Sequence, residues 1–426
     1  MTGSEYRIGH GADAWRRYHR RMRITALLLA CCWLAACTHA RPLTAPATVI
    51  LVSVDGLPAA TVGSGVMPTL DAIAASGTRA EGLVPSYPTH TFPNHYTLVT
   101  GLRPDRHGIV HNSMRDAGLG RFVSKNPASA SDGRWWGGEP IWATLQKQGG
   151  IAATMFWPGS EAEIGGQRPR YFQRFDGSLG VAARVDQVLA WLDLPPAQRP
   201  QLLTLYMERY DVAAHAGGMQ SPQARAALQA IDAALARLRD GLHQRGLAAS
   251  TNLIVLSDHG MADVRGADVH YLDDVVALEA VRIEYAGAMT GLTPVPGQET
   301  TVEAALLGRH DRYQCWRKSE LPAAWQYGRN PRIPAIVCQA DVGWRLWTRG
   351  MPALAALKGE HGYAPESPLM HGVFVASGPA FVAGGRIPAF DNVDVYPLLA
   401  RLLQITPAAN DGDIRPLLPA LLERAR

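Results

Sequence analysis

The segment Thr48–Val54 reads TVILVSV and ends at the pair Asp55-Gly56. A continuous apolar, β-branched run of this length is typical of a strand that is buried on both faces of a sheet. Further strands of this kind are predicted at residues 151–157, 202–207, 253–257 and 373–377.

Amphipathic segments separate these predicted strands. Helices are predicted at residues 67–76, 91–100, 141–148, 179–192, 224–245 and 393–403. Strands that alternate with helices predict an α/β fold, with a largely parallel central sheet covered by helices on both faces. Residues 265–355 break this alternation, and we interpret them as a small inserted subdomain.

The first 36 residues have the pattern of an export signal. A basic stretch, Arg16 to Arg23, precedes a short apolar run that ends in Leu-Ala-Ala-Cys37. This ending resembles the bacterial lipobox, in which Cys37 becomes the acylated first residue. Residues 1–36 are therefore predicted to be a lipoprotein signal peptide and residues 37–47 a tether. The protein is expected to be exported to the periplasm and lipid-anchored to the outer membrane.

Two alternatives to this N-terminal prediction stay open. The segment could be an ordinary signal peptide that happens to contain Cys37, and Met22 could be the true start of the chain.

The formal charge of +4 is confined to the predicted signal. Residues 1–36 contain six arginines against Glu5 and Asp13, so that segment alone carries +4. The remainder holds 35 basic and 35 acidic residues and is neutral. The composition therefore gives no reason to expect binding to a nucleic-acid polymer.

The cysteines fit an oxidising compartment. Besides Cys31, Cys32 and Cys37, the chain contains only Cys315 and Cys338. A lone pair in an exported chain predicts a disulfide.

Polar residues follow three of the predicted strands. They are Asp55, then Asp211 with His215, and then Asp258 with His259. Ligands of open parallel sheets bind at the carboxyl ends of the strands, so these side chains are expected to converge. A mixture of Asp and His suits zinc or, less selectively, manganese.

His361, in the sequence Gly-Glu-His-Gly-Tyr, is the remaining candidate ligand, with His371 as an alternative. Three Asp and three His residues divide naturally between two metal ions. Each residue taken singly also has an ordinary structural explanation, such as a turn or a cap.

Residues 88–101 read PTHTFPNHYTLVTG. This segment closely resembles the nucleophile segment of the bacterial nucleotide pyrophosphatase/phosphodiesterases, the type I phosphodiesterases of the alkaline phosphatase superfamily. Further matching motifs surround Asp55, Asn112, Trp157, Asp211, Asp258 and His361. The resemblance covers about residues 48–400 and implies an alkaline phosphatase-like catalytic domain, which we expect over residues 48–420.

The resemblance also implies a role for individual residues. Thr91 matches the nucleophile that forms a covalent nucleotidyl intermediate, and Asn112 the donor to a phosphate oxygen. Phe92 and Phe175 match substrate-stacking positions, although the family usually has Tyr in place of Phe175 and often Lys in place of His90. The implied ligands of two zinc ions are Asp211, His215 and His361 for one, and Asp55, Asp258, His259 and Thr91 for the other.

The implied activity is metal-dependent hydrolysis of phosphodiester and pyrophosphate bonds in nucleotides, such as nucleoside triphosphates and dinucleotides, to nucleoside monophosphates. Two alternatives stay open. One is a hydrolase of the same superfamily that acts on lipid headgroup phosphodiesters, phosphonates or monoesters. The other is an inactive, metal-binding surface lipoprotein. The sequence does not indicate an oligomeric state.

Overall fold

In the computed structural model, the run TVILVSV is an inner strand of an eight-stranded sheet. Five neighbouring strands of this sheet run parallel to one another. The strand at one edge of these five pairs antiparallel with the first of the three remaining strands. The sheet is therefore largely parallel, as the sequence predicts. Across the sheet the order is β20 (Gly385–Ile387), β2 (Thr78–Ala80), β19 (Phe374–Ser377), β9 (Thr251–Leu256), β1 (Thr48–Val54), β8 (Leu202–Met207), β6 (Ala152–Met155) and β7 (Tyr171–Gln173).

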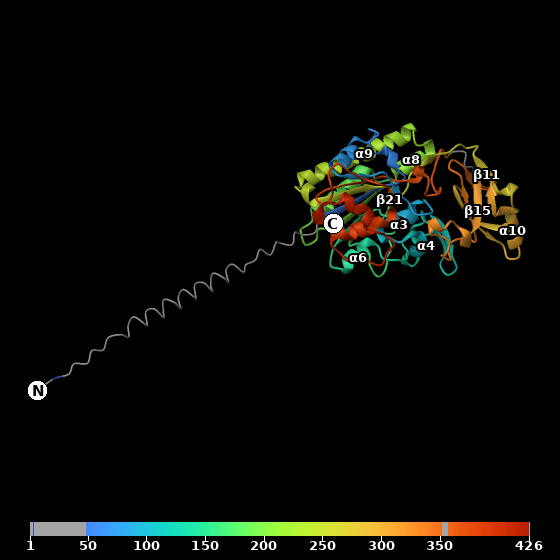
Figure 1. The fold of residues 1–426 in the computed structure, drawn as a ribbon, viewed down its shortest axis with the longest axis horizontal. Coiled ribbons are helices and arrows are strands. Elements are labelled where there is room, and N and C mark those ends of the chain that lie inside the picture. Colours follow the sequence, from blue (N-terminus) through green and yellow to red (C-terminus); the bar gives the residue numbers. More distant parts are fainter. Residues whose placement is uncertain (1–2, 4–47, 352–356, 426) are drawn as a thin grey trace. The chain divides into compact units, whose positions relative to one another are not determined.

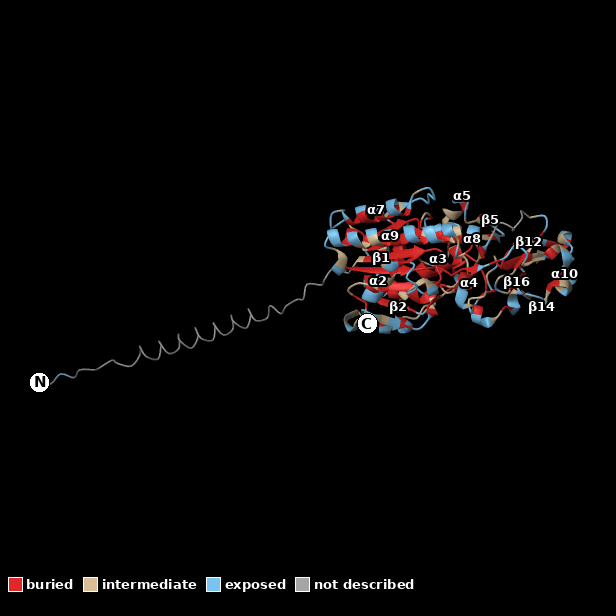
Figure 2. Ribbon diagram, turned by 90° about the horizontal axis from the view of Figure 1, so that it is seen from above, coloured by how far each residue is buried: buried red, intermediate tan, exposed pale blue. Residues whose placement is uncertain are grey.

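Helices cover both faces of this sheet (Figure 1). The two-residue period of β1 divides its side chains between two cores: Val49 and Leu51 face one, and Ile50 and Val52 the other. Figure 2 shows the buried strands between helices whose outer faces are exposed. The first core is closed by α3 (Thr91–Thr100), α6 (Ile141–Lys147) and α11 (Val395–Leu403), and the second by α2 (Pro68–Ser76), α7 (Val181–Leu192) and α9 (Pro222–Gln244).

Several element boundaries differ from the predicted ones for identifiable reasons. Strand β6 ends at Met155 because Phe156 has a φ of 66°, which an extended strand does not allow. Helix α9 begins earlier than predicted because the Ser221 hydroxyl accepts the N–H of Ala224 and Pro222 occupies the first turn.

A second, five-stranded antiparallel sheet lies within the predicted insertion at residues 265–355 and belongs to the same compact unit as the central sheet. Helix α10 (Glu299–Leu306) packs on one face of it through Val302 and Leu306. Tyr285, Met289 and Val337 join the first core instead. Its strand order is β12 (Val281–Tyr285), β13 (Met289–Pro294), β16 (Ile336–Ala340), β15 (Tyr313–Arg317) and β14 (Gly308–His310).

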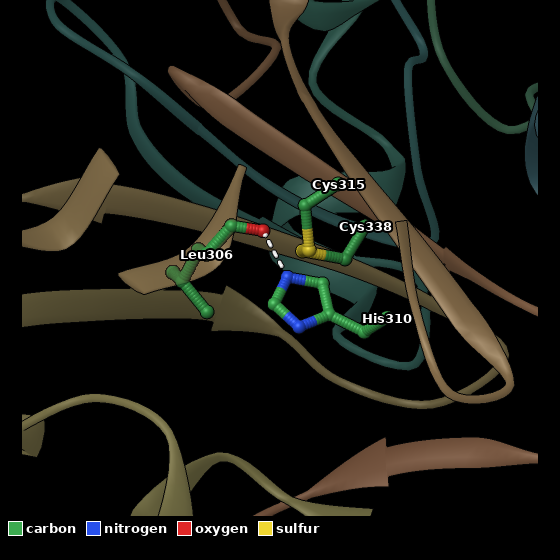
Figure 3. The surroundings of a disulfide bond; sticks show 4 residues. All are labelled: Leu306, His310, Cys315 and Cys338. Carbon is green, nitrogen blue, oxygen red and sulfur yellow. Dashed lines mark hydrogen bonds between the residues drawn. A yellow bond between two sulfur atoms is a disulfide. The ribbon is translucent and has the colours of Figure 1, made fainter. Parts of the chain in front are cut away.

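The predicted disulfide between Cys315 and Cys338 is confirmed (Figure 3). The two cysteines face each other on the antiparallel strands β15 and β16, and both are buried. The bond therefore joins two neighbouring strands of the second sheet covalently.

Removing this disulfide is expected to destabilise the second sheet. The bond closes a loop with a sequence separation of 23 residues, for which the chain-entropy model gives about 3 kcal/mol. We expect the double variant Cys315→Ala/Cys338→Ala to unfold at a lower temperature in a calorimetric scan. Addition of dithiothreitol should lower the Tm of the wild type but leave that of the double variant unchanged. An equal effect of the reductant on both proteins would contradict this account.

The structure describes residue 3 and residues 48–351 and 357–425. The predictions for residues 1–36 and 37–47, including Cys37, thus fall outside the described residues, apart from residue 3. None of the helices in the described part has both the length and the apolar character needed to cross a bilayer. Apart from short 3-10 helices, the remaining described elements are α4 (Pro104–His107), α5 (Pro127–Ala130), α8 (Arg209–Gly217), β3 (Leu83–Val84), β4 (Ser113–Asp116), β5 (Gly120–Val123), β10 (Ala262–Asp263), β11 (Val269–Tyr271), β17 (Arg345–Trp347), β18 (Gly359–Glu360) and β21 (Phe390–Asp391).

Candidate active site

The six predicted ligands meet at the carboxyl ends of the central strands. Asp55 directly follows β1, while Asp258 and His259 follow β9 after one serine. Strand β8 leads into α8, which carries Asp211 and His215 on one face because they are four residues apart. His361 comes from outside the central sheet, in the segment after β18.

The three histidines are oriented by one common contact. Each places Nδ1 within hydrogen-bond distance of a backbone carbonyl: His259 at 2.8 Å from Gly260 O, His215 at 2.8 Å from Gly359 O, and His361 at 2.9 Å from Thr89 O. Because a carbonyl oxygen only accepts, Nδ1 must carry the hydrogen. Such a contact fixes the ring and leaves Nε2 as the free ligand atom, as in metal-binding histidines.

All three Nε2 atoms face carboxylate oxygens. Nε2 of His259 lies 3.4 Å from Asp55 Oδ1 and 3.1 Å from Asp258 Oδ2. Nε2 of His215 and Nε2 of His361 lie 3.3 Å and 3.6 Å from Asp211 Oδ1. Among the described residues, these three carboxylate oxygens are buried and have no hydrogen-bond partner.

Unsatisfied buried oxygens opposite imidazole nitrogens are the donor set of a zinc site. Two groups of ligand atoms lie within 4.8 Å of one another. One contains Asp211, His215 and His361, the same three residues that the family resemblance implies for one zinc ion. The other contains Asp55, Asp211 and His259, so Asp211 belongs to both groups, and Asp258 lies beside the second through its contact with His259. The residues present therefore fit metal ions.

Without a bound cation, the negative charges of the three aspartates in this cluster repel one another. Burial, together with the charges of Asp258 and Asp211, raises the pKa of Asp55 well above its usual value. Burial alone would lower the pKa of His215, but Asp211 raises that pKa to about 9. Crowded carboxylates of this kind favour a bound cation.

Thr91 is the first residue of α3 and places Oγ1 3.3 Å from Nε2 of His259. Asn112 lies beside it: its Oδ1 accepts the N–H of Phe92 at 2.9 Å. This contact fixes the amide and leaves the Asn112 NH₂ group as the donor. The start of the helix offers few free donors, because the N–H of Phe92 is bound to Asn112 and Pro93 has no N–H.

The two predicted stacking residues differ in exposure. Phe92 is half-buried, with its ring centroid 6.0 Å from those of Phe122 and Trp136. The side chain of Phe175 is 50% exposed, and its ring centroid lies 6.2 Å from that of Tyr206. An exposed aromatic ring of this kind has a face available for stacking.

Two further residues, which were not among the predicted site residues, contact the candidate ligands. The Tyr206 hydroxyl donates to Asp55 Oδ2, and Nδ1 of His95 lies 3.1 Å from Asp258 Oδ2. For each of the two residues, the sequence contains a feature that indicates a place in the site. Tyr206 is a polar side chain near the end of a buried apolar strand, and His95 is one helical turn after Thr91 on α3, hence on the same face.

The other histidines lie outside the ligand groups. His107 contacts Thr97 Oγ1 at 3.0 Å and accepts the N–H of Ile109, which makes it a structural residue of the loop. His371 contacts Pro365 O through Nε2 and belongs to neither group, so the structure favours His361 over this alternative. His90 precedes α3 and packs edge-on against His111 and His361.

Gly56 is a position where an added methyl group should damage the site. Its φ is +69°, and a Cβ atom there would lie 3.1 Å from Asp211 Oδ1. We expect Gly56→Ala to lose at least tenfold in activity as well as about 1 kcal/mol in stability from backbone strain. Gly149→Ala is the matched control, because Gly149 has a φ of +88° but no atom within 4 Å of its Cβ position. Equal activities of the two variants would contradict the steric argument.

Most of the chain is similar to known phosphodiesterases. Residues 49–364 match the family model described as type I phosphodiesterase / nucleotide pyrophosphatase. A venom phosphodiesterase of Crotalus durissus collilineatus is 36% identical over 374 residues, which are 85% of this chain and 45% of that protein. An uncharacterised pyrophosphatase/phosphodiesterase of Schizosaccharomyces pombe is 35% identical over 87% of this chain and 80% of its own length. The chain thus spans about half the length of the venom relative.

A solved structure is also similar. Murine ectonucleotide pyrophosphatase/phosphodiesterase 5, an inactive threonine-to-alanine variant in complex with AMP, superposes with a TM-score of 0.84 at 31% identity. The match covers 88% of this chain and 100% of the murine one. These relatives are eukaryotic, so a bacterial origin stays a prediction from the N-terminal segment. The fold, the matched length and the identities together place this chain in the type I phosphodiesterase / nucleotide pyrophosphatase family.

Proposed function

We propose that this protein hydrolyses phosphodiester and pyrophosphate bonds in nucleotides and releases nucleoside monophosphates, through a covalent intermediate on Thr91. One observation carries the proposal. Three histidines, each anchored through Nδ1, present Nε2 to three unsatisfied carboxylate oxygens, and Thr91 Oγ1 lies 3.3 Å from one of these nitrogens.

Two zinc ions are the cofactors that this donor set supports. Asp211, His215 and His361 would hold one; Asp55, Asp258 and His259, with the Thr91 hydroxyl, would hold the other. Bound zinc lowers the pKa of a coordinated hydroxyl or water and offsets the negative charge of the phosphoryl oxygens. Tyr206 and the carbonyls of Gly260, Gly359 and Thr89 hold the ligands in place.

The chain's own residues account for the bond changes. Thr91 Oγ forms a bond to phosphorus while the bond to the leaving oxygen breaks, and the proton of the Thr91 hydroxyl is passed on to that leaving oxygen. Water then attacks the same phosphorus, the bond to Thr91 breaks and the hydroxyl regains a proton. Asn112, whose free NH₂ group lies beside Thr91, would donate to a non-bridging oxygen in both steps.

The base of the nucleotide would lie between aromatic side chains. Phe175 is half-exposed beside Tyr206, and Phe92 follows the nucleophile, so both can offer a ring to a planar base. The AMP complex of the murine relative supports a nucleotide as the substrate class.

Hydrolysis of bis(p-nitrophenyl) phosphate and of p-nitrophenyl phosphate by the zinc-loaded protein tests this function. We expect at least a tenfold preference for the diester in kcat/KM. The proposed product, a nucleoside monophosphate, is itself a phosphate monoester, so the enzyme should release monoesters rather than cleave them. A preference for the monoester would move the protein to the phosphatase alternative. No turnover of these esters or of nucleotides, with two zinc ions bound, would support the inactive binding protein.

We further propose that the protein is exported and anchored through a lipid on Cys37. The names of the relatives, venom enzymes and ectonucleotide enzymes, support export. Fractionation of bacterial cells that express the full chain tests the anchor. We expect the wild type in the membrane fraction and Cys37→Ser in the soluble fraction, whereas identical distributions would rule out the lipid on Cys37.

A further inference from the structure

His95 connects the nucleophile helix to the strand ends. Its side chain is fully buried, and its Nδ1 lies 2.9 Å from Thr91 O and 3.1 Å from Asp258 Oδ2. Nε2 lies 2.8 Å from the hydroxyl of Ser53 on β1. One imidazole thus contacts the backbone of the nucleophile, a candidate metal ligand and the central strand.

The direction of these contacts follows from the partners. Thr91 O is a carbonyl and Asp258 Oδ2 a carboxylate oxygen, so both can only accept, and Nδ1 must carry the hydrogen. Nε2, on the other side of the ring, contacts the Ser53 hydroxyl. The Nδ1 hydrogen thus points to the carbonyl of Thr91, and Nδ1 also lies beside Asp258 Oδ2, at 3.1 Å.

The ring has little freedom to turn. Its centroid lies 5.1 Å from that of Trp157 and 4.9 Å from that of Tyr206, with both rings edge-on. The indole N–H of Trp157 donates to the backbone carbonyl of His95 at 3.1 Å, which holds α3 against the end of β6. Four parts of the fold, at Ser53, Trp157, Tyr206 and Asp258, thus surround this side chain.

We propose that His95 is a positioning residue that orients Asp258 and Thr91 toward the metal ion held by Asp55, Asp258 and His259. The inference rests on the proposed function, because it assumes that this group binds a metal. Among the described residues, the hydrogen bonds and ion pairs of His95 include none with Asp211, His215 or His361, so its effect should be confined to one of the two sites. Residues that orient metal ligands typically contribute ten- to a hundredfold to affinity.

Zinc affinity, measured in competition with a chromophoric chelator, tests this role without any activity assay. We expect His95→Ala to weaken one of two zinc sites by ten- to a hundredfold and to leave the other unchanged. His95→Asn, which keeps an N–H donor near the position of Nδ1, should restore most of the affinity and covers the case in which the alanine variant does not fold. The kcat of His95→Ala should fall with little change in KM, because His95 does not reach the substrate.

His107→Ala is the matched control. His107 is also fully buried and also contacts α3, through Thr97, but it touches none of the candidate ligands. The His107→Ala substitution should lower the Tm and leave both zinc affinities at their wild-type values. Equal zinc affinities for His95→Ala and His107→Ala, or no restoration by His95→Asn, would overturn the positioning role. A wild-type protein that binds no zinc would instead overturn the proposed function, and this inference with it.

Discussion

Replacement of Thr91 by alanine is expected to reduce the turnover of phosphodiesters by a factor on the order of 10⁴ or more. The side chain supplies the atom that bonds to phosphorus, and among the described residues no other hydroxyl is within hydrogen-bond distance of Nε2 of His259. Nucleotide binding should persist, because the aromatic residues and Asn112 remain. The measurements are kcat with bis(p-nitrophenyl) phosphate and the Kd of AMP by calorimetry.

Thr406→Ala is the control for this substitution. Thr406 is exposed, and its two hydrogen bonds with Gln148 use only backbone atoms of the threonine. It should retain wild-type activity. The inactive threonine-to-alanine form of the murine relative, solved with AMP, supports the expectation that binding survives. Retention of more than a tenth of the activity in Thr91→Ala would rule out a covalent intermediate on Thr91.

Removal of metal is expected to reduce both activity and stability. Three buried carboxylate oxygens without hydrogen-bond partners among the described residues converge at the site, so the folded state gains from a cation that the unfolded chain does not bind as well. At a free zinc concentration a thousand times Kd, one site stabilises the fold by about 4 kcal/mol. Chelation should therefore lower the Tm, and zinc should restore it, in a scan followed by circular dichroism.

A pair of histidine variants separates this effect from a general loss of packing. His361→Ala removes a ligand atom 3.6 Å from Asp211 Oδ1 and should reduce the bound zinc to about one ion per chain. His371→Ala removes a ring that contacts Pro365 O and belongs to neither ligand group, so it should keep the zinc content of the wild type. Zinc content is measured by atomic absorption. Equal zinc contents in the two variants would contradict the assignment of His361.

The fold class and most of the secondary structure could be predicted from the sequence. These features depend on patterns within short segments. A β-branched run such as Thr48–Val54 predicts a buried strand, and the helical spacing of apolar residues in α9 predicts a helix with one buried face. The disulfide between Cys315 and Cys338 followed from a count of cysteines. The candidate site followed from polar residues at strand ends, strengthened by motifs such as that at Thr91.

Tertiary structure alone decided how these residues combine. The sharing of Asp211 between two ligand groups depends on the distance between α8 and the ends of β1 and β9, which no local pattern specifies. The contact of His95 with Asp258, and of Tyr206 with Asp55, joins residues more than 150 positions apart. Such contacts arise from helix packing and strand order, and these depend on the whole core rather than on the segments that meet.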